Sequence, residues 1–314
     1  MDMSGSKRID PREIYPTWET ALEIFLLEKR GEGKSERTLY DYETHVKRFF
    51  KSFPQAYQPG RVRRSILEYL GAKISVSTYN LRLQNLKVFY RWCFDEGLFS
   101  ENPAERIKKR KNPGRIVEIS LSDITSLLDC PDVSTFTGLR DYVLLLLSLD
   151  TGIRPNEALN LLTGDIEIVD HEVKIRAETA KTRSARTLPI SSETAKNLRK
   201  LIKARLPEWD DSVPLFCTYE GEKMQVNGWY HRVNSYAKRI GKKIRPYDLR
   251  HTFALNFVRN NGNVLALQKI MGHADISMTK KYVALSTKDL HAQHSIASPV
   301  MKLMPQKKRN TKIS

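Results

Sequence analysis

Apolar residues recur at helical spacing along most of this chain, and only one stretch changes to the spacing of β-strands. Apolar positions three, four and seven residues apart form one stripe on a helix, whereas strict alternation marks one face of a strand. The alternation occurs twice, at 173–175 and 188–190, with the polar sequence AETAKTRSART between the two segments. This pattern predicts a mainly α-helical protein with a small antiparallel β-sheet built on a hairpin.

A basic, turn-rich stretch divides the helical segments into two groups. Before it, four amphipathic segments between Thr17 and Cys93 predict a small helical bundle. The dividing sequence, ENPAERIKKRKNPGRIVEIS, contains Asn-Pro and Pro-Gly pairs and is typical of an interdomain linker. Its charges are either simply solvated or contact the phosphates of a nucleic acid. The cations of this run are Arg106, Lys108, Lys109, Arg110 and Lys111.

Beyond the linker, helical spacing returns on both sides of the hairpin. The segment 139–149 is almost entirely apolar, so we expect a buried helix there. The sequence DTGIRPNEALNL breaks one helix at its Thr-Gly pair and starts another at Pro155, because proline is favoured at the first helical position. The remaining helices are expected at 121–128, 191–206, 226–241, 247–260, 263–271 and 276–285.

The charge of the chain indicates a polyanionic partner. Its 314 residues include 53 Lys and Arg against 36 Asp and Glu, a formal net charge of +17. Nucleic acid phosphates release counterions when basic side chains neutralise them, so this surplus of positive charge favours nucleic acid binding. The alternative is that the net charge only keeps the protein soluble. Three widely spaced cysteines match no disulfide or zinc pattern, and no stretch resembles a signal h-region or a membrane span. These features predict a soluble, cytoplasmic protein.

Several candidate site residues lie at breaks between the expected elements. Arg154 follows the Thr-Gly break and has Glu157 one helical turn later, a spacing that also suits a buried structural ion pair. Lys181 is expected at the hairpin tip with Arg183 and Arg186, where a solvated lysine is the ordinary alternative.

A second set of candidates lies in the last third of the chain. In RPYDLRHTFALN, Tyr247 and Arg250 are three residues apart and share one helix face. His251 points about a quarter turn away, and we expect it to be a core histidine. His273 follows a glycine that ends one helix, and Tyr282 lies nine residues later on the next helix, where packing is its ordinary role.

The order and spacing of these residues resemble the catalytic domain of the tyrosine site-specific recombinases, the family of phage integrases and Xer-type enzymes. The matching elements are G-x-R-x-x-E, a lysine on a β-hairpin, R-H-T-F-A, and G-H followed by a tyrosine. The segment SERTLYDYETHVKRFF and the basic linker are similar to the family's core-binding domain and linker. The resemblance implies a SAM-like helical bundle and a catalytic domain of the DNA breaking-rejoining fold, closing around duplex DNA.

The resemblance also implies how the chain is divided and assembled. No further domain is apparent before the helical bundle, which favours a simple Xer-like or transposon-type enzyme. The segment after Tyr282 is expected to dock on a neighbouring protomer of a tetramer that holds two DNA sites. The expected parts are a flexible N-terminus at 1–14, the core-binding domain at 15–105, the basic linker at 106–117, the catalytic domain at 118–297 and a basic tail at 298–314.

In the mechanism that the resemblance implies, Tyr282 attacks a DNA phosphate and leaves a 3′-phosphotyrosyl bond with a free 5′-hydroxyl. Arg154 and Arg250 hold the non-bridging oxygens of the phosphate. Lys181 protonates the leaving 5′-oxygen, and His273 donates a hydrogen bond to the phosphate. Strand exchange would pass through a Holliday junction, in integration and excision or in dimer resolution. A non-catalytic DNA-binding regulator and a type IB topoisomerase-like enzyme are the alternatives.

The residue types suit this chemistry on physical grounds. A phosphoryl-transfer transition state gathers negative charge, so cations fixed beforehand are the main catalytic need. A tyrosine with an ordinary pKa near ~10 also requires a positive pocket or a base. The sequence has no carboxylate cluster with divalent-metal spacing and no G-x-x-x-x-G-K-[ST] loop. We therefore expect neither a metal nor another cofactor.

Tyr247 departs from the family pattern, in which most members have histidine and some have lysine at this position. A neutral phenol can donate a hydrogen bond but is a poor base. We expect Tyr247 to donate to the scissile phosphate, while the proton of Tyr282 passes to the cationic field, to water or to His273. Glu157 is expected to orient Arg154 from behind.

Overall fold

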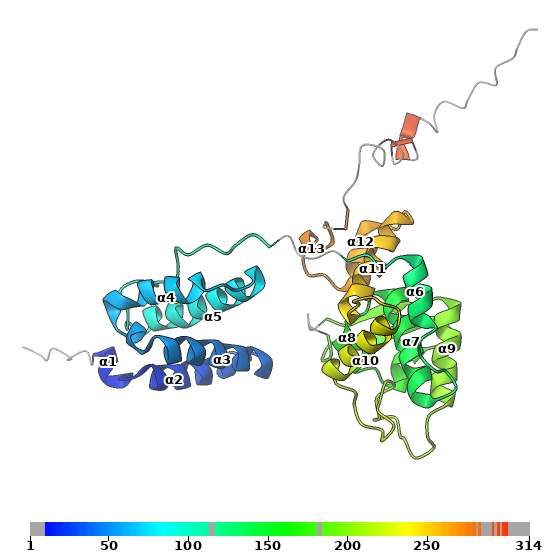
Figure 1. The fold of residues 1–314 in the computed structure, drawn as a ribbon, viewed down its shortest axis with the longest axis horizontal. Helices are drawn as coiled ribbons and strands as arrows, with labels where there is room; N and C mark the ends of the chain where they lie inside the picture. The colour runs from blue at the N-terminus through cyan, green and yellow to red at the C-terminus, as the bar shows by residue number, and fades with distance from the viewer. Residues whose placement is uncertain are drawn as a thin grey trace, which may run out of the picture. The chain divides into compact units, whose positions relative to one another are not determined.

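The computed structural model describes residues 10–112, 117–180, 184–280, 282–283, 291, 294–295 and 297–300. The chain divides into two compact units, Met1–Gly114 and Arg115–Ser314 (Figure 1). This division falls inside the segment that the sequence assigns to the linker. Among the described residues, no helix combines the length and the apolar character needed to cross a membrane.

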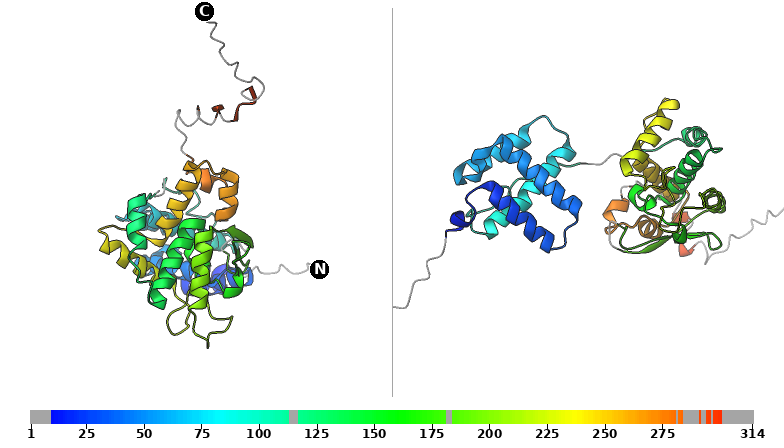
Figure 2. Two further views of the ribbon diagram at one scale, coloured as in Figure 1. Left: turned by 90° about the vertical axis from the view of Figure 1, so that its right-hand side faces the viewer. Right: turned by 90° about the horizontal axis from the view of Figure 1, so that it is seen from below.

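The N-terminal unit is a helical bundle whose main helices begin at hydroxyl caps. Thr17, Ser35 and Ser75 each accept a hydrogen bond from the backbone N–H three residues later, which satisfies a donor that the helix itself leaves unpaired. Helix α3 packs against both α2 and α5. The helices are α1 (Pro11–Ile14), α2 (Trp18–Gly31), α3 (Glu36–Ser52), α4 (Val62–Gly71) and α5 (Val76–Asp95), with 3₁₀ turns at Pro54–Tyr57 and Pro59–Arg61 (Figures 1 and 2).

The start of this unit differs from the flexible N-terminus expected from the sequence. Residues 10–14 are folded, because Arg12 donates to the carbonyl of Leu98 at 3.0 Å. The Arg12 guanidinium also lies 5.8 Å from the centre of the Tyr57 ring. A long-range side-chain contact of this kind could not be read from the local sequence.

The basic segment that follows α5 is also attached to the unit. Asn80 of α5 exchanges two hydrogen bonds of 2.9 Å with the backbone N–H and carbonyl of Arg110. The Arg110 guanidinium lies 4.0 Å from the centre of the Tyr79 ring, and Lys109 donates to Gln84 at 2.8 Å. Residues up to 112 therefore lie along α5, with the positive side chains still exposed.

The C-terminal unit packs its helices around the apolar α7, as the sequence predicted. Leu144 and Leu147 of α7 are fully buried, and this helix contacts both α9 and α11. The described helices are α6 (Leu121–Leu128), α7 (Phe136–Thr151), α8 (Pro155–Ala158), α9 (Ser192–Lys203), α10 (Val226–Arg239), α11 (Pro246–Arg259), α12 (Val264–Met271) and α13 (Ser277–Lys280), with a 3₁₀ turn at Thr163–Asp165.

A small antiparallel sheet completes this unit. Strands β1 (Ile166–Glu167), β2 (Glu172–Ile175) and β3 (Arg186–Pro189) pair in the order β1-β2-β3. The hairpin of β2 and β3 was predicted, whereas the two-residue β1 is too short to show alternation. In the register of the hairpin, Val173 lies opposite Leu188. The mainly α-helical fold with a small antiparallel sheet is thus confirmed.

The last predicted helix is wrong in its extent. The sequence suggested 276–285, but α13 ends at Lys280 and Tyr282 lies in a turn. The backbone N–H of Tyr282 bonds to the carbonyl of Thr279 at 3.0 Å, which is the three-residue spacing of a tightened turn. The segment 284–290 and most of the tail lie outside the described residues.

Candidate functional site

Arg250 lies in the second turn of α11, and the start of this helix is fixed by its own residues. The backbone N–H of Arg245 donates to the carboxylate of Asp248 at 3.0 Å, as in a capping box. The side chain of Arg250 is buried and donates to the backbone carbonyls of Gly152 and Met271. Two segments that are distant in the sequence therefore hold this guanidinium in one orientation.

The environment of Arg250 is short of negative charge. Burial, followed by the nearby charge of Arg154, lowers the pKa of Arg250 to about 10, and the carboxylate of Glu157 only partly offsets this. The guanidinium is still protonated at neutral pH. A pKa lowered in this way means that an arriving anion would relieve an unfavourable charge.

Arg154 reaches the same place from the end of α7. Gly152 ends α7 with a φ of 60°, and a Cβ on this glycine would lie 2.4 Å from the Phe253 ring, so glycine fits both the backbone and the space. Arg154 then precedes α8, is buried, and donates to the carbonyl of Gly272 at 2.6 Å. It also donates to Glu157 at 2.9 Å, the pair that the helical spacing suggested.

Glu157 binds a second arginine, which corrects the expected place of Arg186. The sequence put Arg186 at the hairpin tip, but it begins β3 and its side chain turns inward. It donates to the two oxygens of Glu157 at 3.2 and 2.7 Å, and to the carbonyl of Ile270 at 3.0 Å. Arg186 therefore joins the sheet to the carboxylate that also holds Arg154.

The carboxylate of Glu157 is charged at neutral pH. Burial alone would raise its pKa, but the hydrogen bonds and charges of Arg186 and Arg154 outweigh burial and lower the pKa below 4.5. Because the folded-state pKa is lowered, this carboxylate stabilises the fold above its ordinary pKa of 4.5, and that stabilisation is lost as the pH falls through the lowered value.

Replacing Glu157 with glutamine is expected to lower the free energy of unfolding by about 3–5 kcal/mol at pH 7, because Arg154 and Arg186 lose their shared anion. Urea unfolding measures this change. The control is Glu193→Gln, which removes an exposed charge 3.7 Å from Lys196 and should change stability by less than about 1 kcal/mol. Equal stability of the two variants would contradict the role assigned to Glu157.

His273 contacts Arg250 from the connection between α12 and α13. Gly272 ends α12 with a φ of 60°, which turns the chain so that the imidazole is buried. The Nε2 of His273 lies 3.0 Å from Nη2 of Arg250, and its Nδ1 lies 2.8 Å from the hydroxyl of Thr279. Because arginine only donates, neutral His273 carries its proton on Nδ1 in this arrangement.

Tyr282 is buried within reach of the charge of Arg250, and its hydrogen-bond partner is His251, which was expected to be a core residue. The phenol oxygen of Tyr282 lies 2.6 Å from Nδ1 of His251, which is half-buried rather than a core residue. The Tyr282 ring packs with a small apolar cluster that includes Ala254 and Met271. Burial raises the pKa of Tyr282, and the charge of Arg250 offsets part of the rise.

The other predicted site residues are either exposed or outside the described part of the chain. Tyr247 lies on the first turn of α11 and is 53% exposed, so its phenol faces solvent while Arg250 on the same helix is buried. Lys181 and Arg183 lie outside the described residues. The basic run Arg106, Lys108, Lys109, Arg110 and Lys111 belongs to the N-terminal unit, where all five side chains are exposed.

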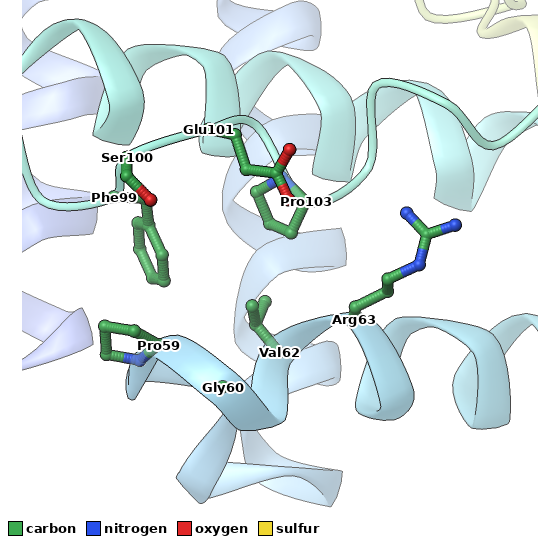
Figure 3. Close-up of a pocket in the computed structure, with 8 residues that line it drawn as sticks. All are labelled: Pro59, Gly60, Val62, Arg63, Phe99, Ser100, Glu101 and Pro103. Carbon is green, nitrogen blue, oxygen red and sulfur yellow. The ribbon is translucent and has the colours of Figure 1, made fainter.

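A surface hollow of the N-terminal unit is separate from these residues. It has a volume of about 160 Å³ and lies between the start of α4 and the segment 99–103 (Figure 3). Phe99 points toward Pro59, and Arg63 points away (Figure 3). None of the candidate site residues lines this hollow.

The gathered residues suit an anionic substrate. Arg154 and Arg186 form ion pairs with the carboxylate of Glu157, and Arg250 is near enough for this carboxylate to offset part of its charge, so the group of three arginines keeps a surplus of positive charge. A phenol hydroxyl lies beside this surplus. Within the described parts of the chain, no three or more His, Cys, Asp or Glu residues are placed to hold a metal ion. Fixed cations beside a nucleophile can stabilise negative charge that develops on a phosphate.

Comparison with known proteins identifies the family to which this chain belongs. The Phage integrase family matches residues 118–289. The tyrosine recombinase XerA of Pyrococcus horikoshii is 30% identical over 296 residues, which cover 92% of this chain and 94% of that protein. The tyrosine recombinase XerC of Thermodesulfovibrio yellowstonii is 28% identical over 283 residues, or 87% of this chain and 94% of that protein. The chain therefore belongs to the phage integrase family and is a site-specific tyrosine recombinase.

Solved structures support the fold. The Tn1549 transposon integrase in complex with transposon right end DNA is 17% identical, with a TM-score of 0.72 over 88% of this chain and 98% of that chain. The XerH recombinase bound to difH substrate is also 17% identical, with a TM-score of 0.66 over 94% of this chain and 91% of that chain. The family, fold and enzyme class predicted from the sequence are confirmed, and a non-catalytic regulator is not favoured.

Proposed function

We propose that the chain cleaves and rejoins duplex DNA through a covalent bond between Tyr282 and a 3′-phosphate. The observation that supports this most is that the buried phenol of Tyr282 feels the positive charge of Arg250, which itself contacts His273. A nicked suicide substrate tests the proposal, because the freed 5′-strand diffuses away and rejoining is prevented. A protein–DNA adduct that survives denaturation is expected, whereas tight binding without an adduct would contradict the proposal.

The two buried arginines would act on the non-bridging oxygens of the scissile phosphate. A guanidinium is a planar fork that matches phosphate geometry. The carbonyls of Gly152 and Met271 orient Arg250, and the carbonyl of Gly272 orients Arg154, so both forks are fixed before the substrate arrives. Such fixed charges stabilise the transition state without the cost of reorganisation. Glu157 would keep Arg154 in place from the side opposite the substrate.

The leaving group needs a proton, and Lys181 is proposed to supply it. The residue matches the family lysine on the β-hairpin, and a protonated amine can donate to the 5′-oxygen as the bond to phosphorus breaks. The strand β3 that follows the tip is attached to Glu157 through Arg186. His273 is proposed to donate a hydrogen bond from Nε2 to the same phosphate once its contact with Arg250 opens and Nε2 takes up a proton.

Replacing Tyr247 with phenylalanine is expected to lower the cleavage rate by about 10- to 100-fold, because a hydrogen bond to a charged group contributes about 1.5–3 kcal/mol. Single-turnover cleavage of a suicide substrate measures the rate. Tyr247→His should retain activity, since imidazole also donates. The control Tyr219→Phe changes another exposed tyrosine of the same unit and should have no effect. Full activity of Tyr247→Phe would remove this residue from the mechanism.

Duplex DNA is the proposed partner of both units. The net charge of +17 supports this, and so do the exposed cations of the segment along α5. Among the similar structures, the lambda integrase dimer is bound to a COC′ core site, with a TM-score of 0.69. We propose that backbone phosphates are contacted by Arg183 and by the basic run Arg106, Lys108, Lys109, Arg110 and Lys111. Reaction on cellular DNA would place the protein in the cytoplasm.

We further propose that strand exchange passes through a Holliday junction within a tetramer on two DNA sites. The segment that would join the protomers, after Tyr282, lies largely outside the described residues. This proposal comes from the family mechanism, in either integration and excision or dimer resolution. The related type IB topoisomerase activity would relax supercoils without forming junctions, so gel analysis of reaction products distinguishes the two.

A further inference from the structure

The candidate nucleophile has a specific partner that the expected mechanism does not use. The phenol oxygen of Tyr282 lies 2.6 Å from Nδ1 of His251, and the two ring centroids are 5.8 Å apart at an interplanar angle of 46°. The rings are therefore joined through their polar atoms rather than stacked. The contact depends on how α11 meets the turn after α13, so it is a property of the folded chain and not of a local sequence pattern.

The directions of successive side chains on α11 explain how this helix supplies both Arg250 and the partner of Tyr282. Consecutive residues of a helix point about 100° apart. Arg250 therefore points toward the carbonyls of Gly152 and Met271, while His251 points toward the turn that carries Tyr282. Helix α12 contacts both α11 and α13, so it fixes the distance between the two partners (Figure 1).

Tyr282 needs a proton acceptor in this environment. Burial raises the pKa of its phenol, and the positive charge of Arg250 offsets only part of that rise. The phenol is therefore protonated at neutral pH and is a weak nucleophile until the proton leaves. Tyr247, at the position where most of the family has a histidine, is largely exposed and is itself a phenol. A neutral imidazole is a much better acceptor than either.

We propose that His251 is the general base that accepts the proton of Tyr282 during DNA cleavage. This inference rests on the proposed function of Tyr282 as the nucleophile. The phenol proton moves to Nδ1 of His251 as the bond from the phenol oxygen to phosphorus forms and the bond from phosphorus to the 5′-oxygen breaks. The leaving oxygen takes its proton from Lys181.

In the reverse step, a 5′-hydroxyl attacks phosphorus and gives its proton back to Lys181, and the bond from phosphorus to Tyr282 breaks. Nδ1–H of His251 then returns the proton to the phenol oxygen, so the histidine ends each cycle neutral. The surrounding charges assist this exchange. Arg250 on the same helix contacts His273, and the charge of Arg154 acts on Arg250, so the group is cationic and favours the phenolate as it forms.

His251→Asn tests the inference, because an amide retains hydrogen bonding near the position of Nδ1 but is not a base. Adduct formation on the suicide substrate is expected to slow by about 10²- to 10⁴-fold, with DNA affinity unchanged. The matched control is His171→Asn in the turn between β1 and β2. His171 is exposed and has a φ of 55°, which asparagine adopts readily, so this control should cleave DNA at the wild-type rate.

A substrate with sulfur in place of the leaving 5′-oxygen shows whether His251 acts as a general base or as a general acid. Sulfur leaves without protonation, so this substrate should restore a variant that lacks the acid and should leave His251→Asn as slow as before. Added imidazole should raise the rate of His251→Ala, where a free base can enter the space. A merely structural histidine would show no such recovery.

The outcomes distinguish this inference from the proposed function. If the wild-type protein binds DNA and forms no adduct, the proposed function fails. If the wild-type protein forms the adduct and His251→Asn cleaves equally fast, only the inference fails. Recovery of His251→Asn on the sulfur substrate would also overturn it, since that result would make His251 the acid. A His251→Ala variant that does not respond to imidazole would count against a base at this position.

Discussion

Tyr282→Phe is expected to abolish the covalent protein–DNA adduct, with a loss of cleavage of about 10⁵-fold or more, as removal of a nucleophile does in other covalent enzymes. Phenylalanine keeps the ring that packs beside Ala254 and Met271, so the fold should be retained. Loss of the hydrogen bond to His251 should cost about 1 kcal/mol of stability. Denaturing gels measure the adduct, and mobility shift on the uncleaved site measures DNA binding.

The control for this variant is Tyr236→Phe in α10. Tyr236 is also buried, and its hydroxyl lies 2.7 Å from the carboxylate of Asp141, with which it forms a hydrogen bond. This change removes a similar buried contact without touching the candidate site, so the adduct should still form. If Tyr282→Phe cleaves DNA as Tyr236→Phe does, another residue is the nucleophile.

Arg250→Lys is expected to lower the cleavage rate by about 10²- to 10³-fold although the charge is kept. Lysine cannot donate from one planar fork to the carbonyls of Gly152 and Met271 and to a phosphate at the same time. Single-turnover kinetics at saturating protein measure the effect on chemistry rather than on binding.

Arg259→Lys on the same helix is the matched control. Arg259 is exposed and pairs with Glu118 rather than with residues of the site. Cleavage at the wild-type rate is expected, because exposed ion pairs contribute little to stability. A rate for Arg250→Lys within a factor of about three of this control would show that charge alone suffices.

The candidate site residues could be named from the sequence because their order and spacing resemble the family, and several of them also lie at local breaks in the pattern. Arg154 follows a glycine that ends a helix, and His273 follows another, so each lies at a break in the helical pattern. Arg250 stands out as a cation in an apolar helix. Helix and strand positions followed from hydrophobic spacing, since most elements bury one face against a core.

The contacts of His251 and Arg186 could not be predicted in the same way. The partner of His251 depends on where the chain turns after α13, and that turn replaces a helix that the local pattern favoured. Arg186 was assigned to the hairpin tip, because nothing in the local sequence shows that Glu157 lies within reach of β3. Both contacts join segments that are distant in the sequence, so no local sequence pattern predicts them.

The most direct test of the proposed chemistry is to identify the bond between protein and DNA. The adduct on a suicide substrate is digested with a protease, and the DNA-linked peptide is sequenced by mass spectrometry. We expect a 3′-phosphate on Tyr282, with a free 5′-hydroxyl on the released strand. A DNA link to any other residue, or a 5′-phosphate link, would contradict the proposed mechanism.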